Sequence, residues 1–253
     1  DVSFLNNGWV KTPNIDKLAS GGLIVTNYYS SSPVSSPSRV GLTTGRFPTE
    51  MGINCYLQTR KGNAACEQFD YLDASVPTMA KVMKSAGYTT GHFGKWHMGG
   101  GRDVIDAPQI TEYGFDEYIS TWESPNPDPV ITDSAWIWSR TDQVKRWDRT
   151  AYFVDKTLDF LKRHKGEPCF VNLWPDDMHT PWVPSQKTMD SERTSWTTPP
   201  NFKEVLTEYD KQIGRLMEGL TKLGLEKNTI VIFTSDNGPA PSFQQMCTNS
   251  LLG

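Results

Sequence analysis

The clearest helical pattern in the chain lies in residues 201–223, where apolar side chains recur at steps of three and four residues. The apolar positions are Phe202, Val205, Leu206, Tyr209, Ile213, Leu216, Met217 and Leu220. This spacing places them on one face of a helix. Residues 150–164 show a similar pattern, with Phe153 and Leu161 among the residues on one side. We therefore predict two amphipathic helices in the second half of the chain.

Shorter helices are predicted from the residues at their ends. Residues 12–22 begin with a capping threonine followed by Pro13, and two glycines close the segment. Residues 76–88 have the composition of a helix that stops at Gly87. A further helix is expected to begin near Pro37, directly after a serine-rich loop.

Four segments are predicted to be strands. Residues 23–29 are rich in β-branched and aromatic side chains, residues 89–96 run into a glycine-rich loop, and residues 169–174 and 229–234 are almost continuously apolar. Residues 100–149 lack a clean period and are expected to form long loops with short elements. The alternation of helix and strand predicts an α/β fold with a largely parallel central sheet flanked by helices.

Composition narrows the class of protein. The chain has 253 residues, of which 37% are hydrophobic and 21% charged, as in a soluble globular domain. A net charge of −4 gives no reason to expect general attraction to nucleic acid or to a membrane surface. No apolar run approaches the ~20 residues that span a bilayer. The four cysteines match no zinc-site spacing, and a disulfide between Cys55 and Cys66 is left open.

Reactive side chains follow four of the predicted strands. Ligands of open α/β sheets bind beyond the carboxyl ends of the strands, so these side chains are expected to converge. They are Ser35 and Arg39 after the first strand, Lys95 and His97 after the second, Asp176, Asp177 and His179 after the third, and Asp236 and Asn237 after the fourth. The convergence indicates a single site.

Each cluster also has a simpler interpretation. Asp236 and Asn237, followed by glycine, are typical of a β-turn, although their oxygens suit Ca²⁺ or Mg²⁺. Lys95 and His97 would face the same side of an extended segment, as a shared anionic ligand requires, but they could be an ordinary surface lysine and a packed imidazole. His179 could be a turn residue.

Three further polar residues receive structural interpretations. Asp177 could support an imidazole, but a solvated loop acid is the favoured interpretation. His92 lies within a predicted strand and is expected to be a core or edge residue. His164 ends a helix, where a cation interacts favourably with the helix dipole.

With these clusters in view, the chain resembles the type I sulfatases of the alkaline phosphatase superfamily. "SSPSRVGLTTGR" (residues 35–46) is similar to the family signature C/S-x-P-S-R followed by a Thr-Gly-Arg run, and "GKWHMG" is similar to its second signature. "TPNIDKLASGGLIVTNYY", "HTP" and "SDNG" match further family segments in the right order. The resemblance covers nearly the whole of residues 1–253.

The resemblance implies a nucleophile made from Ser35. In this family the first residue of the signature is oxidised to formylglycine by a maturing enzyme, and the hydrated aldehyde attacks sulfur. Sulfate is then expelled and the aldehyde is regenerated. An unmodified serine hydroxyl is a weak nucleophile without a nearby base, so the modification matters.

The resemblance also implies roles for the other clusters. Arg39 would orient the hydrate, Lys95 and His179 would contact the sulfate, and His97 would assist its release. Asp236, Asn237 and the Ser35 hydrate would bind Ca²⁺, or else Mg²⁺. Weaker candidates for substrate contacts are Arg102, Asp103 and Asp177.

Two family features do not appear in this sequence. A paired Asp usually lies on a strand before the segment seen here, and a lysine usually follows the SDNG motif. We therefore expect residues 1–253 to be a sulfatase catalytic domain that is truncated at both ends and is inactive as it stands. The family further suggests a periplasmic or secreted enzyme.

The expected substrate is a sulfated carbohydrate. Tryptophans in the loops could stack on sugar rings, although core packing is favoured for any single one; they are Trp122, Trp136, Trp138, Trp174 and Trp182. One alternative is a phosphodiesterase or phosphonate hydrolase of the same superfamily. Another is a non-catalytic protein that binds sulfated glycans. Two metal ions at ~3.5–4 Å would favour the phosphatase-type chemistry.

Overall fold

The computed structural model describes residues 2–6, 9–132, 138–190 and 197–239. Its centre is a parallel three-stranded sheet in the order β2-β1-β3. The strands are β1 (Thr89–Gly94), β2 (Glu117–Ser120) and β3 (Cys169–Trp174). Their registers align Gly94 with Ser120 on one side and with Trp174 on the other. The carboxyl ends of all three strands therefore meet at one edge of the sheet.

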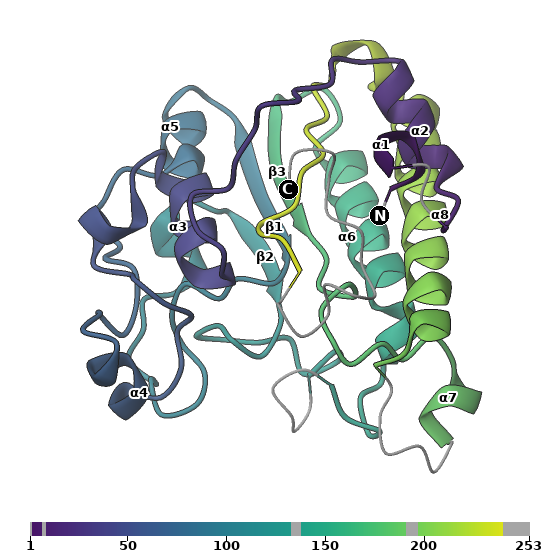
Figure 1. Ribbon diagram of the computed structural model, residues 1–253. Helices are drawn as coiled ribbons and strands as arrows, with labels where there is room; N and C mark the ends of the chain where they lie inside the picture. The colour runs from purple at the N-terminus through teal and green to yellow at the C-terminus, as the bar shows by residue number, and fades with distance from the viewer. Residues whose placement is uncertain (1, 7–8, 133–137, 191–196, 240–253) are drawn as a thin grey trace.

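Helices lie on both sides of this sheet (Figure 1). One side carries α3 (Ser35–Thr44), α4 (Arg60–Ala65) and α5 (Met79–Ser85). On the other side lie α6 (Arg149–Arg163), which packs on β1 and β3, and α8 (Pro199–Leu223), which packs on α6. This arrangement confirms the predicted α/β class with a parallel sheet flanked by helices.

The remaining elements are short. They are the helices α1 (Ser3–Asn6), α2 (Pro13–Ser20) and α7 (Gln186–Asp190), and the 3-10 helices η1 (Pro48–Met51), η2 (Ile110–Tyr113), η3 (Arg146–Asp148) and η4 (Glu226–Asn228). Helix α2 begins at Pro13 and ends before Gly21, as its end signals predict. Among the described residues no helix combines the length and the apolar character needed to cross a bilayer.

Two apolar clusters fill the space beside the sheet. Between the sheet and α6, the buried residues include Phe93, Phe153 and Phe160. On the opposite side, Trp96 and Tyr113 are central to a larger cluster. The amphipathic pattern of α6 and α8 thus buries the faces that the sequence predicts.

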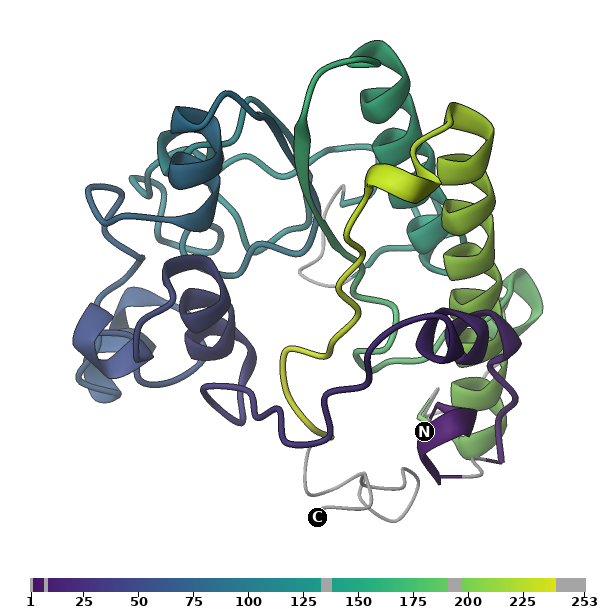
Figure 2. The same ribbon diagram turned by 90° about the horizontal axis from the view of Figure 1, so that it is seen from above.

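Two predicted strands are absent. Residues 23–29, which contain a turn, and residues 229–234 have no ladder pairing, and most of their apolar side chains are exposed, with Leu23 at 89% and Ile230 at 90%. Figure 2 shows the second segment returning from the end of α8 toward the middle of the molecule. In the described part of the chain neither segment is paired with a strand of the sheet, and composition alone cannot make a strand.

The cysteine pair that was left open is not bridged. Cys55 and Cys66 are both thiols. Partial burial and then a hydrogen bond with Cys66 raise the pKa of Cys55. Cys247 lies outside the described residues.

Candidate active site

The site is built where the three strands end. Lys95 follows β1 directly, and its backbone N–H donates to the Trp174 carbonyl over 2.8 Å. Gly94 makes this approach possible, since it has φ 131° and a Cβ there would lie 2.1 Å from the Trp174 carbonyl oxygen. The loops after β1, β2 and β3 are therefore brought side by side.

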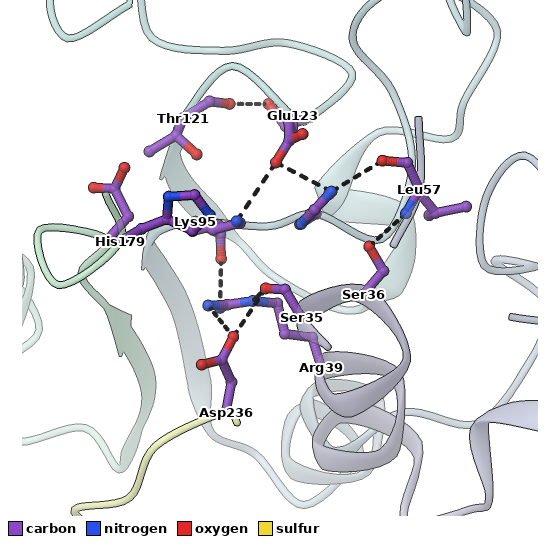
Figure 3. A network of polar contacts seen from close by, with 12 residues as sticks. Ser35, Ser36, Arg39, Leu57, Lys95, Thr121, Glu123, His179 and Asp236 are labelled. Carbon is purple, nitrogen blue, oxygen red and sulfur yellow. Dashed lines mark hydrogen bonds and ion pairs between the residues drawn. The ribbon is translucent and has the colours of Figure 1, made fainter. Parts of the chain in front are cut away.

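Ser35 is the first residue of α3, and its hydroxyl lies between two charged side chains (Figure 3). Arg39, one helical turn later, donates from Nε to Ser35 Oγ over 2.9 Å. The hydroxyl in turn donates to Asp236 Oδ2 over 2.8 Å. The sequence-predicted cluster of Ser35, Arg39 and Asp236 is thus a connected triad drawn from residues about 200 positions apart.

Arg39 is held from several directions. Its Nη2 forms an ion pair with Asp236 Oδ2 at 2.9 Å, and its Nη1 donates to the Lys95 carbonyl over 3.2 Å. The guanidinium also lies over the Trp174 ring, 5.1 Å from its centre. Burial alone would raise the pKa of Asp236, but Arg39 and the Ser35 hydroxyl hold it below its usual value. This fixed geometry orients the Ser35 oxygen.

Lys95 and His97 converge on a carboxylate that the sequence analysis did not select, Glu123. Its Oε2 lies 3.1 Å from His97 Nε2 and 3.5 Å from Lys95 Nζ, and all three side chains are buried. The predicted convergence of Lys95 and His97 is confirmed, but the reason is different. His97 has φ 52°, so a left-handed residue rather than strand alternation turns its side chain to the shared side.

The electrostatics of this cluster are set by burial and by the neighbouring charges. Burial would raise the pKa of Glu123, but His97, Lys95 and Arg102 hold it well below its ordinary range. Burial lowers the pKa of both Lys95 and His97, and Glu123 opposes that shift. Glu123 therefore keeps positive charge in the site that burial would otherwise remove.

One ring nitrogen of His97 has no hydrogen-bond partner among the described residues. Its Nε2 is close to two acceptors, Glu123 Oε2 and the Leu57 carbonyl at 3.1 Å, so this nitrogen carries the hydrogen. Its Nδ1 is buried and has no hydrogen-bond partner among the described residues. This nitrogen is available to a bound ligand.

Arg102 and Asp103, two of the weaker candidates for substrate contacts, lie in different surroundings. Arg102 donates from Nη2 to Glu123 Oε1 over 3.2 Å and so belongs to the charged cluster. Asp103 is exposed, and its Oδ1 accepts the backbone N–H of Arg60 over 3.0 Å. The structure therefore brings Arg102 to the site and turns Asp103 toward a neighbouring loop.

His179 reaches the same region from the loop after β3. It is exposed to solvent and lies near Lys95 in Figure 3. The surrounding protein atoms, and then the charge of Lys95, lower the pKa of its imidazole. Its Nδ1 lies 2.6 Å from the Thr180 carbonyl oxygen.

The interpretation of Asp177 as a solvated loop acid is wrong. Asp177 is 7% exposed, and its Oδ2 accepts the backbone N–H of Thr150 over 3.3 Å and also the Thr150 hydroxyl. Burial and then the charge of Asp176 raise its pKa. Its role is an anchor at the start of α6, which a sequence pattern cannot distinguish from a loop acid.

The structural interpretations of the other histidines are confirmed. His92 is fully buried among Trp96, Phe115 and Trp174. His164 caps the end of α6 and lies 3.0 Å from Glu167.

Two of the five tryptophans considered for sugar stacking pack against other side chains of the protein. Trp182 packs edge-on against Phe202 in a buried cluster, and Trp174 supports Arg39. Trp136 lies outside the described residues.

The oxygen donors near Ser35 fit a hard cation in type but form an incomplete set. The Asp236 carboxylate and the Ser35 hydroxyl adjoin, and the Asn237 amide follows directly in the chain. Within the ranges that the structure describes, no group of three or more His, Cys, Asp or Glu side chains is arranged to hold a metal. Since Ca²⁺ takes 6–8 oxygens, further ligands would be needed.

The arrangement as a whole suits an anionic ester. Arg39 donates to the Ser35 hydroxyl, and Lys95 and His179 lie in the same region in Figure 3. His97 is linked to Lys95 through Glu123. The start of α3 directs backbone N–H groups toward the same place. Such preorganised donors stabilise negative charge in a transition state.

Comparison with known proteins gives a consistent identification. The family model "Sulfatase" matches residues 1–247. An N-acetylgalactosamine-6-O-sulfatase of Bacteroides thetaiotaomicron is 29% identical over 94% of this chain and 56% of its own length. The human N-acetylgalactosamine-6-sulfatase is 29% identical over 91% of this chain and 46% of its own length.

The structural comparison agrees. A solved Bacteroides thetaiotaomicron structure, from work on the metabolism of multiple glycosaminoglycans, has a TM-score of 0.72 and 27% identity, covering 91% of this chain and 58% of that chain. The chain spans about half the length of the curated relatives it matches. The predicted alkaline-phosphatase-like fold class is confirmed, and this chain belongs to the sulfatase family.

Proposed function

We propose that this chain carries the catalytic centre of a sulfuric ester hydrolase that removes sulfate from a sulfated carbohydrate. The observation that carries the proposal is the position of Ser35 Oγ, which accepts from Arg39 and donates to Asp236. A hydroxyl oriented by an arginine and an aspartate, at the start of a helix and beside Lys95, is suited to attack on an anionic ester. Membership of the sulfatase family supports sulfur as the centre attacked.

The reactive form of Ser35 is proposed to be formylglycine, installed by a maturing enzyme. The hydrated aldehyde would supply the attacking hydroxyl. The other residues bind and orient: Arg39 fixes the oxygen at position 35, while Lys95 and His179 contact the sulfate. His97 is proposed to accept a proton at Nδ1, the buried nitrogen without a partner among the described residues, and so to assist release of sulfate.

A divalent cation is proposed to be held by Asp236, Asn237 and the oxygen at position 35. The donors are all hard oxygens, which favours Ca²⁺ or Mg²⁺ over softer metals. The cation would neutralise charge on the sulfate. The described residues contribute part of its coordination sphere, so we expect weak binding by residues 1–253 alone.

The proposed substrate is a sulfated sugar at the end of a glycan. The names of the relatives make the 6-sulfate of N-acetylgalactosamine the first compound to test. Periplasmic or secreted location is proposed because enzymes that act on sulfated glycans meet them outside the cytoplasm.

Sulfate release from a panel of sulfated sugars and from a chromogenic aryl sulfate tests the proposal, using the full-length matured protein. We expect desulfation with a strong preference for one sulfate position. A phosphodiester and a phosphonate ester form the second arm of the assay. Activity on these esters with none on any sulfated sugar would contradict the proposal, and binding of sulfated sugar without turnover would indicate a glycan-binding protein.

Glu123 provides a separate prediction, because it is the counter-charge of Lys95, which is proposed to contact the sulfate. In Glu123→Gln the buried Lys95 and His97 lose their counter-charge, so the free energy of unfolding should fall by about 3 kcal/mol. Inorganic sulfate should bind roughly tenfold more weakly, because burial then lowers the pKa of Lys95 and His97 without opposition from Glu123, and the site loses positive charge. Urea unfolding and calorimetric titration measure the two effects.

The matched control is Glu117→Gln, which removes a carboxylate from an exposed ion pair with Arg163. This control should lower the free energy of unfolding by less than about 1 kcal/mol, and its affinity for inorganic sulfate should not change. Tighter sulfate binding by Glu123→Gln would show that Glu123 competes with the anion rather than supporting the positive charge of its site.

A further inference from the structure

A buried network of charges lies beneath the loop that carries His179. Its members are Asp142, Arg146, Arg149, Asp176 and Asp177, each no more than 9% exposed. Asp176 Oδ2 accepts from Arg146 Nη1 over 2.7 Å and from Arg149 Nη1 over 2.9 Å. The proposed reaction uses none of these side chains directly.

Arg146 holds both ends of the turn that leads to His179. Its Nη2 donates to the Asp176 carbonyl over 2.6 Å and to the His179 carbonyl over 3.0 Å. The turn is closed by its own hydrogen bond, from the His179 N–H to the Asp176 carbonyl over 3.0 Å. One planar guanidinium therefore fixes the carboxylate of Asp176 and two backbone carbonyls of this turn.

The same turn is tied to the start of α6 at two more points. Arg149 joins Asp176 to the Ile131 carbonyl, which its Nη2 reaches over 2.7 Å. Asp177 accepts the backbone N–H of Thr150. Asp176 and Asp177 are thus both hydrogen-bonded to residues 149–150. The loop cannot shift without breaking these charged hydrogen bonds.

Stability does not explain this arrangement. Taking several charges out of water costs about as much as their attraction returns, and apolar side chains of similar volume often stabilise a protein more. What a bidentate guanidinium provides is a fixed orientation of its partners, which a lysine cannot reproduce. The orientation fixed here is that of the backbone of His179.

We propose that Arg146 is a positioning residue that holds His179 at the sulfate site, with Asp176 and Arg149 holding Arg146. The proposal rests on the proposed function in one respect, namely that His179 contacts the sulfate. Arg146 lies behind the turn and acts through its backbone. Displacement of a contact group by about 1 Å can cost on the order of 100-fold in rate.

The test uses Arg146→Lys in the full-length matured protein, with Arg163→Lys as the matched control. Arg163 is the last residue of α6 and forms an exposed ion pair with Glu117. We expect Arg146→Lys to lower kcat for an aryl sulfate by roughly 10- to 100-fold, with a smaller change in KM, because the turn loses two of its three hydrogen bonds to this residue. The control should stay within about twofold of wild type.

A double-mutant cycle with His179→Ala separates positioning from general damage. If Arg146 acts through His179, Arg146→Lys should cost less than about threefold once His179 is absent. Equal losses in both backgrounds would overturn the proposal, and so would wild-type kcat in Arg146→Lys.

The imidazole resonances give a readout that needs no activity. The chain has four histidines, so His179 can be assigned by comparison with His179→Ala. In Arg146→Gln the His179 resonance should shift and titrate at higher pH, because the loop becomes more solvated and a neighbouring positive charge is removed. The resonance of His164, which caps the end of α6, should be unchanged.

These outcomes distinguish the two proposals. A wild-type protein that releases no sulfate would contradict the proposed function, and the titration would still decide whether Arg146 holds His179. An unchanged His179 resonance in both Arg146 variants would overturn the positioning role. Should Arg146→Gln fail to fold, Arg146→Lys supplies the same measurement.

Discussion

Replacing Ser35 with alanine should abolish turnover of the full-length matured protein, by roughly 10³- to 10⁶-fold in kcat. The alanine has neither a hydroxyl nor the precursor of formylglycine. The rest of the site should survive, because Arg39 and Asp236 retain their direct ion pair at 2.9 Å. Binding of inorganic sulfate should therefore change little, and steady-state kinetics with calorimetry would separate the two effects.

The neighbouring serines provide the controls. Ser36 is buried and accepts the backbone N–H of Leu57 over 2.9 Å, so Ser36→Ala should lower stability by about 1 kcal/mol and leave turnover within a few-fold of wild type.

The peptide that contains Ser35 should lack the mass of two hydrogens in a host with a serine-specific maturing enzyme.

Changing the host extends the test of Ser35. Ser35→Cys should be active only where a cysteine-specific maturing enzyme is present. Wild-type protein should stay unmodified and nearly inactive in a host without a serine-specific one. Full activity of Ser35→Ala would contradict the mechanism.

The helices could be predicted from sequence because their signals are local. The repeat of apolar residues in α8 and the Thr12–Pro13 start of α2 lie within the elements themselves. Helix α3 begins at Ser35 rather than near Pro37, a small difference at an end where the serine-rich loop gives no clear boundary. Strands β1 and β3 were also predicted, since each is followed by a loop that marks its end.

Strands that depend on a partner were harder to predict. Residues 229–234 have the composition of a buried strand, yet Ile232 is 83% exposed and the segment has no ladder. Conversely, β2 lies in a stretch rich in Pro and Asp without alternation and was not predicted. Pairing with β1 makes it a strand, and that pairing is a property of the tertiary structure.

Because β2 was not predicted, Glu123 was not recognised as a residue of the site. Glu123 reads as an ordinary loop acid in "TWESPNP". Once Ser120 is known to pair with Gly94 at the edge of the sheet, the loop after β2 must lie beside Lys95. The rule that ligands bind beyond the carboxyl ends of parallel strands would then have selected Glu123. The same rule did select Lys95 and His179, which follow β1 and β3, whereas residues 23–29 before Ser35 are not a strand.

Replacing Asp236 with alanine should remove the divalent cation and the activity together. Its carboxylate is the acidic ligand that the described residues offer next to Ser35, and it also offsets the charge of Arg39. We expect the metal content per chain to fall to background and kcat to fall by at least about 10³-fold. Elemental analysis of dialysed full-length protein measures the first effect and sulfate release the second.

A control variant must separate the loss of metal from the loss of an ion pair, and Asp70→Ala serves as that control. Asp70 pairs with Arg60, and its side chain is 24% exposed, the same fraction as that of Asp236. Asp70→Ala should therefore remove an ion-paired carboxylate of the same exposure while keeping the cation and kcat. In wild type, a cation at 100 times its Kd should add about 2.7 kcal/mol to the free energy of unfolding, and a chelator should remove this increment. Asp236→Ala should show no such increment, and unchanged metal content in that variant would contradict the assignment of Asp236 as a ligand.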